Sequence, residues 1–291
     1  MQNQANKLKE IVEKSSPKSR KTDTKFISIT SGKGGVGKST ISANLANILA
    51  KNGYKVALFD ADIGLANLDV ILNVSIQKNI LNVLKGECSL SEVIINVDKN
   101  LMLIPGESGD EILKYSDQFI FERFFDETSM LDDLDFVIID TGAGIGRHIQ
   151  LFLEASDEVV VVTVPDPSAI TDAYATIKVT SKIKSDLHLI LNMTKSEKEA
   201  RLIFEKIKKV ALANIGDNLN LNLIGRLSDD KIIARSIKQR TLFTNDYPNS
   251  SASADLKSIA NNLVYKLERK VLKDSERRSF GSFFKRLIEQ F

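Results

Sequence analysis

Cysteine is almost absent from this sequence, which has only Cys88 among 291 residues, and tryptophan is missing altogether. A single cysteine excludes an intramolecular disulfide and any CxxC pair, and it cannot hold an iron–sulfur cluster within one chain. The sequence is therefore typical of a protein that works in a reducing compartment. The two histidines, His148 and His188, are expected to be ordinary helix and strand residues.

Long apolar runs are missing as well. No segment approaches the roughly 20 consecutive apolar residues that are needed to cross a bilayer. The first residues also lack the apolar stretch of about 7–15 residues that is found in a secretory signal. We therefore expect a cytoplasmic protein whose contacts with a membrane are peripheral.

The chain has no strong excess of charge of either sign, since 40 Lys and Arg face 38 Asp and Glu. The balance hides an uneven distribution, because residues 1–25 and residues 269–291 each carry seven basic and three acidic side chains. Basic ends on a mildly acidic body indicate contacts with an anionic surface or an acidic partner. Solvated tails explain the same pattern equally well.

The pattern of apolar residues divides the chain into three regions. Residues 1–25 combine a short amphipathic segment with a polar linker, residues 26–273 alternate apolar runs with helical periodicity, and residues 274–291 end in a second amphipathic segment. The expected strands are 26–30, 55–60, 101–104, 135–140, 158–164, 187–191 and 221–224, and the expected helices are 38–51, 110–127, 146–155, 167–181, 196–213 and 251–273. Near-continuous β-branched runs mark strands that are buried on both faces. We therefore predict a doubly wound α/β domain with a mainly parallel sheet of about seven or eight strands.

A glycine-rich segment joins the first expected strand to the first expected helix. It reads Gly32-Lys33-Gly34-Gly35-Val36-Gly37-Lys38-Ser39-Thr40, which matches the Walker A pattern GxxxxGK[ST]. Backbone N–H groups of such a loop form a cradle for an anion, and the helix N-terminus adds about half a positive charge. We expect Lys38 to reach the β- and γ-phosphates of a nucleotide, and the Ser39 hydroxyl to hold Mg²⁺.

Three carboxylates follow expected strands. Asp60 and Asp62 come at the end of the second strand, and Asp140 ends the fourth, just before Thr141-Gly142-Ala143-Gly144. The carboxyl ends of parallel strands face the ligand crevice of such a sheet, so these side chains are expected near the phosphates and Mg²⁺. Taken singly, each aspartate is also explained as a helix cap or a turn residue.

The extra lysine of the loop, Lys33, makes the pattern more specific. KGGVGKST resembles the deviant Walker A sequence of the MinD/ParA ATPase family. This resemblance implies that Lys33 crosses a homodimer interface to the partner's phosphates, much as an arginine finger does. It implies that Asp62 orients the attacking water, that Asp60 and Asp140 join Ser39 in supporting Mg²⁺, and that Thr141–Gly144 form switch II.

The sequence favours adenine over guanine. A GTPase of this class carries Asn-Lys-x-Asp after a late strand, whereas this chain has Asn192-Met193-Thr194-Lys195. The resemblance to MinD implies that Asn192 contacts the adenine. The later loop of that group contains Ile-Pro-x-Asp, but here it reads Gly225-Arg226-Leu227-Ser228-Asp229-Asp230, which leaves the packing of the base open.

The last twelve residues form one apolar helical face with cations on the other side. The apolar residues are Phe280, Phe283, Phe284, Leu287, Ile288 and Phe291, and the cations are Lys285 and Arg286. A helix of this length reaches only about 18 Å, so it is too short to span a bilayer and fits the plane of the headgroups instead. It resembles the membrane-targeting helix of MinD. The alternative is a helix packed on the sheet, and both hold if the helix is stowed in the monomer and released in the dimer.

The first residues resemble one group within this family. The segment Asn3-Gln4-Ala5-Asn6-Lys7-Leu8-Lys9 is similar to the Asp-Gln-Ala-x-x-Leu-Arg motif of FlhG, a regulator of flagellar number and placement. Positions 3 and 9 depart from the motif. The resemblance implies that residues 1–25 activate a signal-recognition-type GTPase, FlhF, through Gln4, Ala5 and Leu8.

Together these patterns predict a slow, Mg-ATP-dependent dimerising ATPase of the FlhG type, cytoplasmic and bound to the inner face of the membrane when loaded with ATP. Its expected partners are a second copy, the FlhF-type GTPase, anionic lipid, and flagellar basal-body or transcriptional regulators. Specific nucleic-acid binding is not expected, because a DNA-binding surface depends on cationic side chains, whereas the C-terminal face is rich in phenylalanine. A MinD-type division-site regulator, a ParA-type partition ATPase, and a scaffold that binds ATP without turnover remain as alternatives.

Overall fold

An eight-stranded sheet in the order β3-β4-β2-β5-β1-β6-β7-β8 forms the centre of the protein. A computed structural model describes residues 24–62, 68–107, 111–112, 124–216, 218–270 and 279–288. The strands are β1 (Lys25–Ser31), β2 (Val56–Ala61), β3 (Ile95–Asp98), β4 (Leu101–Pro105), β5 (Phe136–Ala143), β6 (Glu158–Thr163), β7 (Asp186–Thr194) and β8 (Asn220–Ser228). Neighbouring strands are parallel except for β3 and β4, which are antiparallel. The predicted fold class is therefore confirmed.

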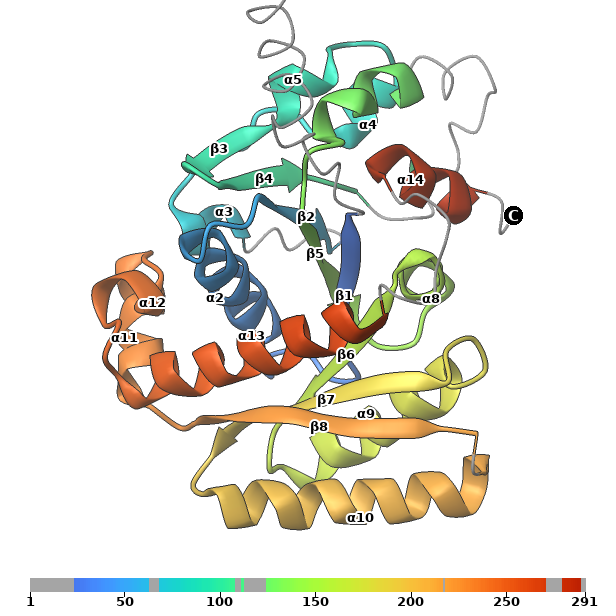
Figure 1. Ribbon diagram of the computed structural model, residues 1–291, viewed down its shortest axis with the longest axis vertical. Helices are drawn as coiled ribbons and strands as arrows, with labels where there is room; N and C mark the ends of the chain where they lie inside the picture. Colours follow the sequence, from blue (N-terminus) through green and yellow to red (C-terminus); the bar gives the residue numbers. More distant parts are fainter. Residues whose placement is uncertain are drawn as a thin grey trace, which may run out of the picture.

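The helices cover both faces of this sheet (Figure 1). They are α2 (Lys38–Lys51), α3 (Leu68–Leu72), α4 (Ile80–Leu84), α5 (Leu90–Val93), η1 (Ser129–Leu131), α8 (Arg147–Ala155), α9 (Pro167–Thr180), α10 (Glu197–Ile215), α11 (Lys231–Gln239), α12 (Phe243–Asp246), α13 (Ser251–Lys270) and α14 (Phe280–Ile288). α2 and α13 share one apolar cluster with the sheet, whereas α8, α9, α10 and α14 pack on the opposite face.

Alternation along β1 shows how the sequence builds these two layers. Ile27 and Ile29 point into the cluster that contains α2 and α13, while Phe26 points into the cluster that contains α14. All three side chains are fully buried. A strand in the middle of a parallel sheet is covered on both faces, which is why even the small polar residues Ser28 and Thr30 of β1 are fully buried.

One strand escaped prediction. β3 (Ile95–Asp98) pairs with β4 in an antiparallel hairpin at the end of the sheet. Its residues alternate between half-buried and exposed, since it has a neighbour on one side only. A four-residue strand with two polar positions does not stand out in a sequence that is read for buried apolar runs.

The carboxyl ends of three adjacent strands bring the predicted site together. β5 lies between β1 and β2, and Asp140 is in register with both Asp60 on β2 and Ile29 on β1. β5 continues to Ala143, beyond the expected end at residue 140, because Thr141 pairs with Ala61 and Ala143 with Ser31. The first three residues of the predicted switch II are therefore still part of the sheet.

Some predicted elements lie outside the described residues. Of the helix expected over 110–127, the structure describes only its ends, and of residues 1–25 it describes only the last two. Among the described residues, no helix combines the length and the apolar composition needed to cross a membrane.

Candidate functional site

The glycine-rich loop lies between β1 and the first turn of α2. Gly37 ends the loop with φ 87°, a left-handed conformation that favours glycine. A Cβ at this position would lie 2.4 Å from Nδ2 of Asn192. Among the described residues, no side chain caps the N-terminus of α2. Its first N–H groups are therefore free of side-chain acceptors, as an anion-binding helix start requires.

Lys38 joins the loop to two of the predicted carboxylates. Its side chain is 7% exposed, and its Nζ donates to Oδ1 of Asp140 at 3.0 Å. The same Nζ lies 3.7 Å from Oδ2 of Asp62. Because Asp140 is buried, the lysine charge neutralises it in this state. The fold thus brings Lys38, Asp62 and Asp140 together, although Lys38 and Asp140 are 102 positions apart in the sequence.

Asp60 is buried beside this pair. Burial, followed by the charge of Asp140, raises the pKa of Asp60 from its ordinary value of 3.8 to about 7. Its Oδ1 accepts the backbone N–H of Asp62 at 3.2 Å. Its Oδ2 is buried and has no partner within the part of the chain that the structure describes. An unpaired buried carboxylate oxygen at this edge is what a cation would satisfy.

The predicted metal ligands fit Mg²⁺, although they do not make a complete cage. Ser39, Asp60 and Asp140 offer hydroxyl and carboxylate oxygens, which are the hard donors that Mg²⁺ prefers. Across the described ranges, no three His, Cys, Asp or Glu side chains converge on a metal position. Mg²⁺ in nucleotide sites is bound through one or two carboxylates plus substrate phosphates, so this incomplete set agrees with a metal that arrives with the nucleotide.

The predicted switch II lies against Asp62 and the phosphate loop. A Cβ on Gly142 would lie 3.1 Å from Oδ1 of Asp62. The Thr141 hydroxyl is buried near the carbonyl of Ile29, and the N–H of Gly144 donates to the carbonyl of Ser31 at 2.7 Å. The segment therefore connects the aspartate predicted to orient water with the strand that carries the loop.

Lys33 is held by residues that sequence reasoning did not identify. Its exposed Nζ donates to Oδ1 of Asp166 at 3.2 Å and to the Ser168 hydroxyl. Asp166 also caps α9 by accepting the N–H of Ala169 at 3.0 Å. Three hydrogen bonds lower the pKa of Asp166 to about 2, and in order of decreasing effect they come from Ser168, Ala169 and Lys33. The PDPSAIT segment, with Asp before Pro, carried the signal of a helix cap but not of a lysine partner.

Asn192 ties the end of β7 to the phosphate loop. It is 4% exposed, and its Nδ2 donates to the carbonyl of Val36 at 2.8 Å. Its Oδ1 accepts the N–H of Met193, whose φ of 54° is left-handed. The predicted adenine contact thus sits beside the loop.

Ser42 is a second residue that the sequence did not single out. It lies one turn after Lys38 on α2, and its hydroxyl donates to Oδ1 of Asp140 at 2.9 Å. It is fully buried. A serine four residues after the Walker lysine has no recognisable pattern, because only the fold shows which strand it faces.

The C-terminal helix is docked on the protein. Phe280, Phe283, Phe284 and Leu287 are each 1% exposed or less. Phe283 stacks on Phe26 with ring centroids 4.6 Å apart, and Nη1 of Arg286 lies 3.5 Å from Oδ1 of Asp157. The apolar face predicted to enter a membrane is therefore covered by the sheet in this structure. Lys285 is exposed, and the side chains of Ile288 and Phe291 lie outside the described residues, as do Gln4, Ala5 and Leu8.

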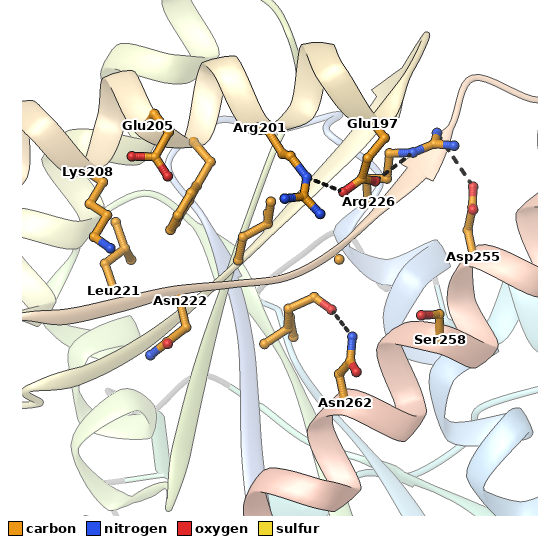
Figure 2. A pocket seen from close by; sticks show the side chains of 14 residues that line it. Glu197, Arg201, Glu205, Lys208, Leu221, Asn222, Arg226, Asp255, Ser258 and Asn262 are labelled. Carbon is orange, nitrogen blue, oxygen red and sulfur yellow. Dashed lines mark hydrogen bonds and ion pairs between the residues drawn. The ribbon is translucent and has the colours of Figure 1, made fainter.

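A groove of about 650 Å³ runs along β8 between α10 and α13, away from the phosphate loop (Figure 2). Arg226 pairs with two acidic side chains of the groove: its Nε lies 3.4 Å from Oε2 of Glu197, and its Nη1 lies 3.8 Å from Oδ2 of Asp255. Asn262 donates to the carbonyl of Ile224 at 2.9 Å. Asn262 of α13 thus satisfies one backbone carbonyl of the last strand in the sheet.

The site defines the class of the protein. A buried parallel strand, a glycine-rich loop, a lysine at the start of a helix and an aspartate on the adjacent strand are the parts of a P-loop NTPase. The model of the ParA family, described as a NUBPL iron-transfer P-loop NTPase, matches residues 23–264. The chain therefore belongs to the ParA/MinD family of P-loop NTPases, whose members are ATPases.

Similar proteins with names indicate which group of this family the chain resembles. The chain is 51% identical to the flagellum site-determining protein YlxH of Helicobacter pylori, over 99% of each chain. It is 32% identical to the antiactivator FleN of Pseudomonas aeruginosa, over 90% of this chain and 93% of that one. Among solved structures, the septum site-determining protein MinD of Pyrococcus horikoshii in complex with Mg-ADP is similar, with a TM-score of 0.66 and 25% identity over 85% of this chain and 98% of that one. The resemblance to the FlhG group of this family is thereby confirmed.

Proposed function

We propose that this protein is a Mg-ATP-dependent dimerising switch that regulates flagellar number and placement by cycling between cytosol and membrane and by acting on an FlhF-type GTPase. Identity of 51% to a flagellum site-determining protein over 99% of each chain supports the biological role. The contact of Lys38 with Asp140, beside Asp62, supports the chemistry. The proposed parts are residues 1–25 as the activator segment, 26–273 as the ATPase domain and 274–291 as the membrane-targeting segment.

The chemistry follows from the charges in the site. Lys38 and the N–H groups at the start of α2 bind the phosphates, and Asn192 lies where the base is expected. Mg²⁺, when bound with the nucleotide at Ser39, Asp60 and Asp140, neutralises charge that develops on the phosphates. Asp62 orients the attacking water, and Lys33 of each subunit stabilises the partner's transition state. For Lys38 to bind phosphate, its ammonium must leave the two carboxylates that it now neutralises.

The docked position of α14 supports a switch in membrane binding. The face that packs on Phe26 and Phe59 is the same face that would enter lipid, so docking and membrane insertion exclude each other. Undocking exposes four large apolar side chains, each worth about 1.5–3 kcal/mol of burial. Burial of the same side chains in lipid offsets most of this cost. Two helices on one dimer also bind with avidity that a single helix lacks. Dimerisation thereby favours the membrane-bound state.

The ATPase cycle is tested by measuring ATP hydrolysis and vesicle binding for the full chain and for Asp62→Ala. With anionic vesicles and ATP, we expect the wild-type protein to hydrolyse ATP and to leave the vesicles as ATP is consumed. The variant should bind ATP, stay on the vesicles and lose at least about tenfold in hydrolysis. Equal hydrolysis by both proteins would reject the proposed role of Asp62. Vesicle binding that is the same with and without ATP would reject the cycle.

The flagellar role is tested by GTP hydrolysis of the FlhF-type GTPase from the same organism. We expect the full chain to stimulate it and Gln4→Ala to abolish the stimulation without changing ATP binding. A MinD-type or ParA-type regulator predicts no stimulation by either protein. That outcome would reject the flagellar role and leave the ATPase chemistry intact.

A further inference from the structure

We infer that Ser42 is a positioning residue for Asp140, fixing the orientation of that carboxylate when Lys38 turns to the nucleotide. The inference rests on the proposed function and concerns the same site. Ser42 is fully buried on α2, and its hydroxyl lies 2.9 Å from Oδ1 of Asp140 and 3.0 Å from the carbonyl of Lys38.

The hydroxyl has one hydrogen, and the carboxylate is the stronger acceptor. Hydrogen bonds to an ionised acceptor are about twice as strong as those between neutral groups. The carbonyl of Lys38 lies within α2, where the helix itself supplies a backbone N–H. The hydrogen of Ser42 therefore points to Asp140.

Two donors now share one oxygen of Asp140. Lys38 donates to Oδ1 at 3.0 Å, and Ser42 donates to the same atom at 2.9 Å. When a nucleotide draws the ammonium of Lys38 to its phosphates, Ser42 remains as the donor from α2 that holds this oxygen. The carboxylate then keeps its rotation, and its second oxygen is the one left for Mg²⁺.

The placement of Ser42 follows from the geometry of the helix. Residues three and four apart lie on one side of an α-helix, so Ser42 is a neighbour of both Lys38 and Ser39, and Lys38 and Ser42 both reach Asp140 on β5. The first two turns of α2 therefore carry the phosphate-binding lysine, the metal-binding hydroxyl and the residue that holds the carboxylate. Groups that orient a metal ligand typically change metal affinity by about 10- to 100-fold when they are removed.

The test compares Ser42→Thr with Ser42→Val in the full chain. The two side chains have nearly the same shape, but only threonine keeps the hydroxyl, so any strain from the added methyl group is common to both. Binding of a fluorescent ATP analogue is measured against MgCl2 concentration and again in EDTA. Ser253→Ala serves as the control, because Ser253 on α13 is also fully buried, but its hydroxyl donates to the carbonyl of Tyr247 at 2.8 Å rather than to a residue of the site.

We expect Ser42→Val to need about tenfold more Mg²⁺ for half-maximal binding, with unchanged affinity in EDTA, and Ser42→Thr to stay within about threefold of wild type. Ser253→Ala should lower the melting temperature without changing the Mg²⁺ requirement. If Ser42→Val does not fold, Ser42→Ala removes the hydroxyl without adding volume and takes its place.

Equal Mg²⁺ requirements for the valine and threonine variants would overturn this inference and leave the proposed function standing. A wild-type protein that shows no Mg²⁺-dependent binding of the analogue would overturn both.

Discussion

Lys33 and Asp166, which are 133 positions apart in the sequence, form an ion pair with Nζ and Oδ1 separated by 3.2 Å. Lys33 is the residue expected to act on the phosphates of a partner subunit, yet here it is engaged within its own chain. Both side chains are about half exposed, so the pair is screened by water and easily exchanged. The lysine must leave this position before it can act in trans.

Removing the charge of Asp166 should favour the dimer. Asp166→Asn keeps an acceptor for the N–H of Ala169, so α9 remains capped while Lys33 loses its ionic partner. An exposed ion pair is worth up to about 1 kcal/mol. Each of the two subunits gives up one such exposed ion pair on dimerisation, so we expect a dimer that is at most about 30-fold tighter with a non-hydrolysable ATP analogue. Analytical ultracentrifugation measures this change. Lys33→Ala is the matched control, and its dimer should not be tighter than that of the wild type. An unchanged or weaker dimer for Asp166→Asn would contradict the prediction.

The raised pKa of Asp60 predicts how stability depends on pH. Since the pKa is about 7 in the folded protein and 3.8 for the free side chain, the folded state binds the proton more tightly. The contribution of this group to stability is therefore fully present below about pH 4 and is lost as the pH rises through about 7. Asp60→Asn has no carboxyl group to titrate at this position, so it should not lose this stability as the pH rises.

Denaturant unfolding of the nucleotide-free protein at pH 5 and pH 8 checks this sign. The stability of Asp60→Asn relative to wild type should rise between pH 5 and pH 8, by at most about 3 kcal/mol, because only the part of the shift that lies between pH 5 and about 7 contributes. Asp98→Asn, an exposed strand residue, is the control and should show no such gain. A difference between Asp60→Asn and wild type that does not grow with pH would show that Asp60 is ionised in the folded protein.

Docking of α14 should contribute measurably to stability. Phe283 is 1% exposed and stacks on Phe26, so Phe283→Ala leaves a cavity in the interface and should cost about 3–5 kcal/mol. The exposed neighbour Lys285 provides the control, for which Lys285→Ala should change stability by no more than about 0.5 kcal/mol. Urea denaturation measures both. Equal stability of the two variants would mean that the helix is not docked in solution.

The conformation of Gly37 predicts a second stability effect. Gly37→Ala places a Cβ in a left-handed backbone position, which costs about 1–2 kcal/mol, and against the amide of Asn192. We expect a lower melting temperature and weaker nucleotide binding. Gly34→Ala is the matched control for stability, because a Cβ there meets nothing within 4 Å. A melting temperature for Gly37→Ala as high as that of Gly34→Ala would contradict the prediction.

The sequence predicted elements whose local pattern is strong. The buried runs of β1, β5 and β6 and the periodicity of α2, α9 and α10 agree with the structure to within a few residues. β3 was missed, because a short strand at the end of a sheet alternates and includes polar residues. The end of β5 was placed too early, since Thr141–Ala143 owe their strand conformation to pairing with β1 and β2 rather than to their own composition.

For the candidate site, the sequence by itself determined the chemistry: a phosphate loop, a lysine and carboxylates at strand ends, because these depend on residue type and short spacing. The tertiary structure alone decided which groups are paired at rest, namely Lys38 with Asp140, Lys33 with Asp166, and Ser42 with Asp140. It also decided that the apolar face of α14 lies against Phe26 rather than in solvent. The physical reason is that an amphipathic helix or a charged side chain has several favourable partners, and only the packing of distant segments determines which of them is within reach.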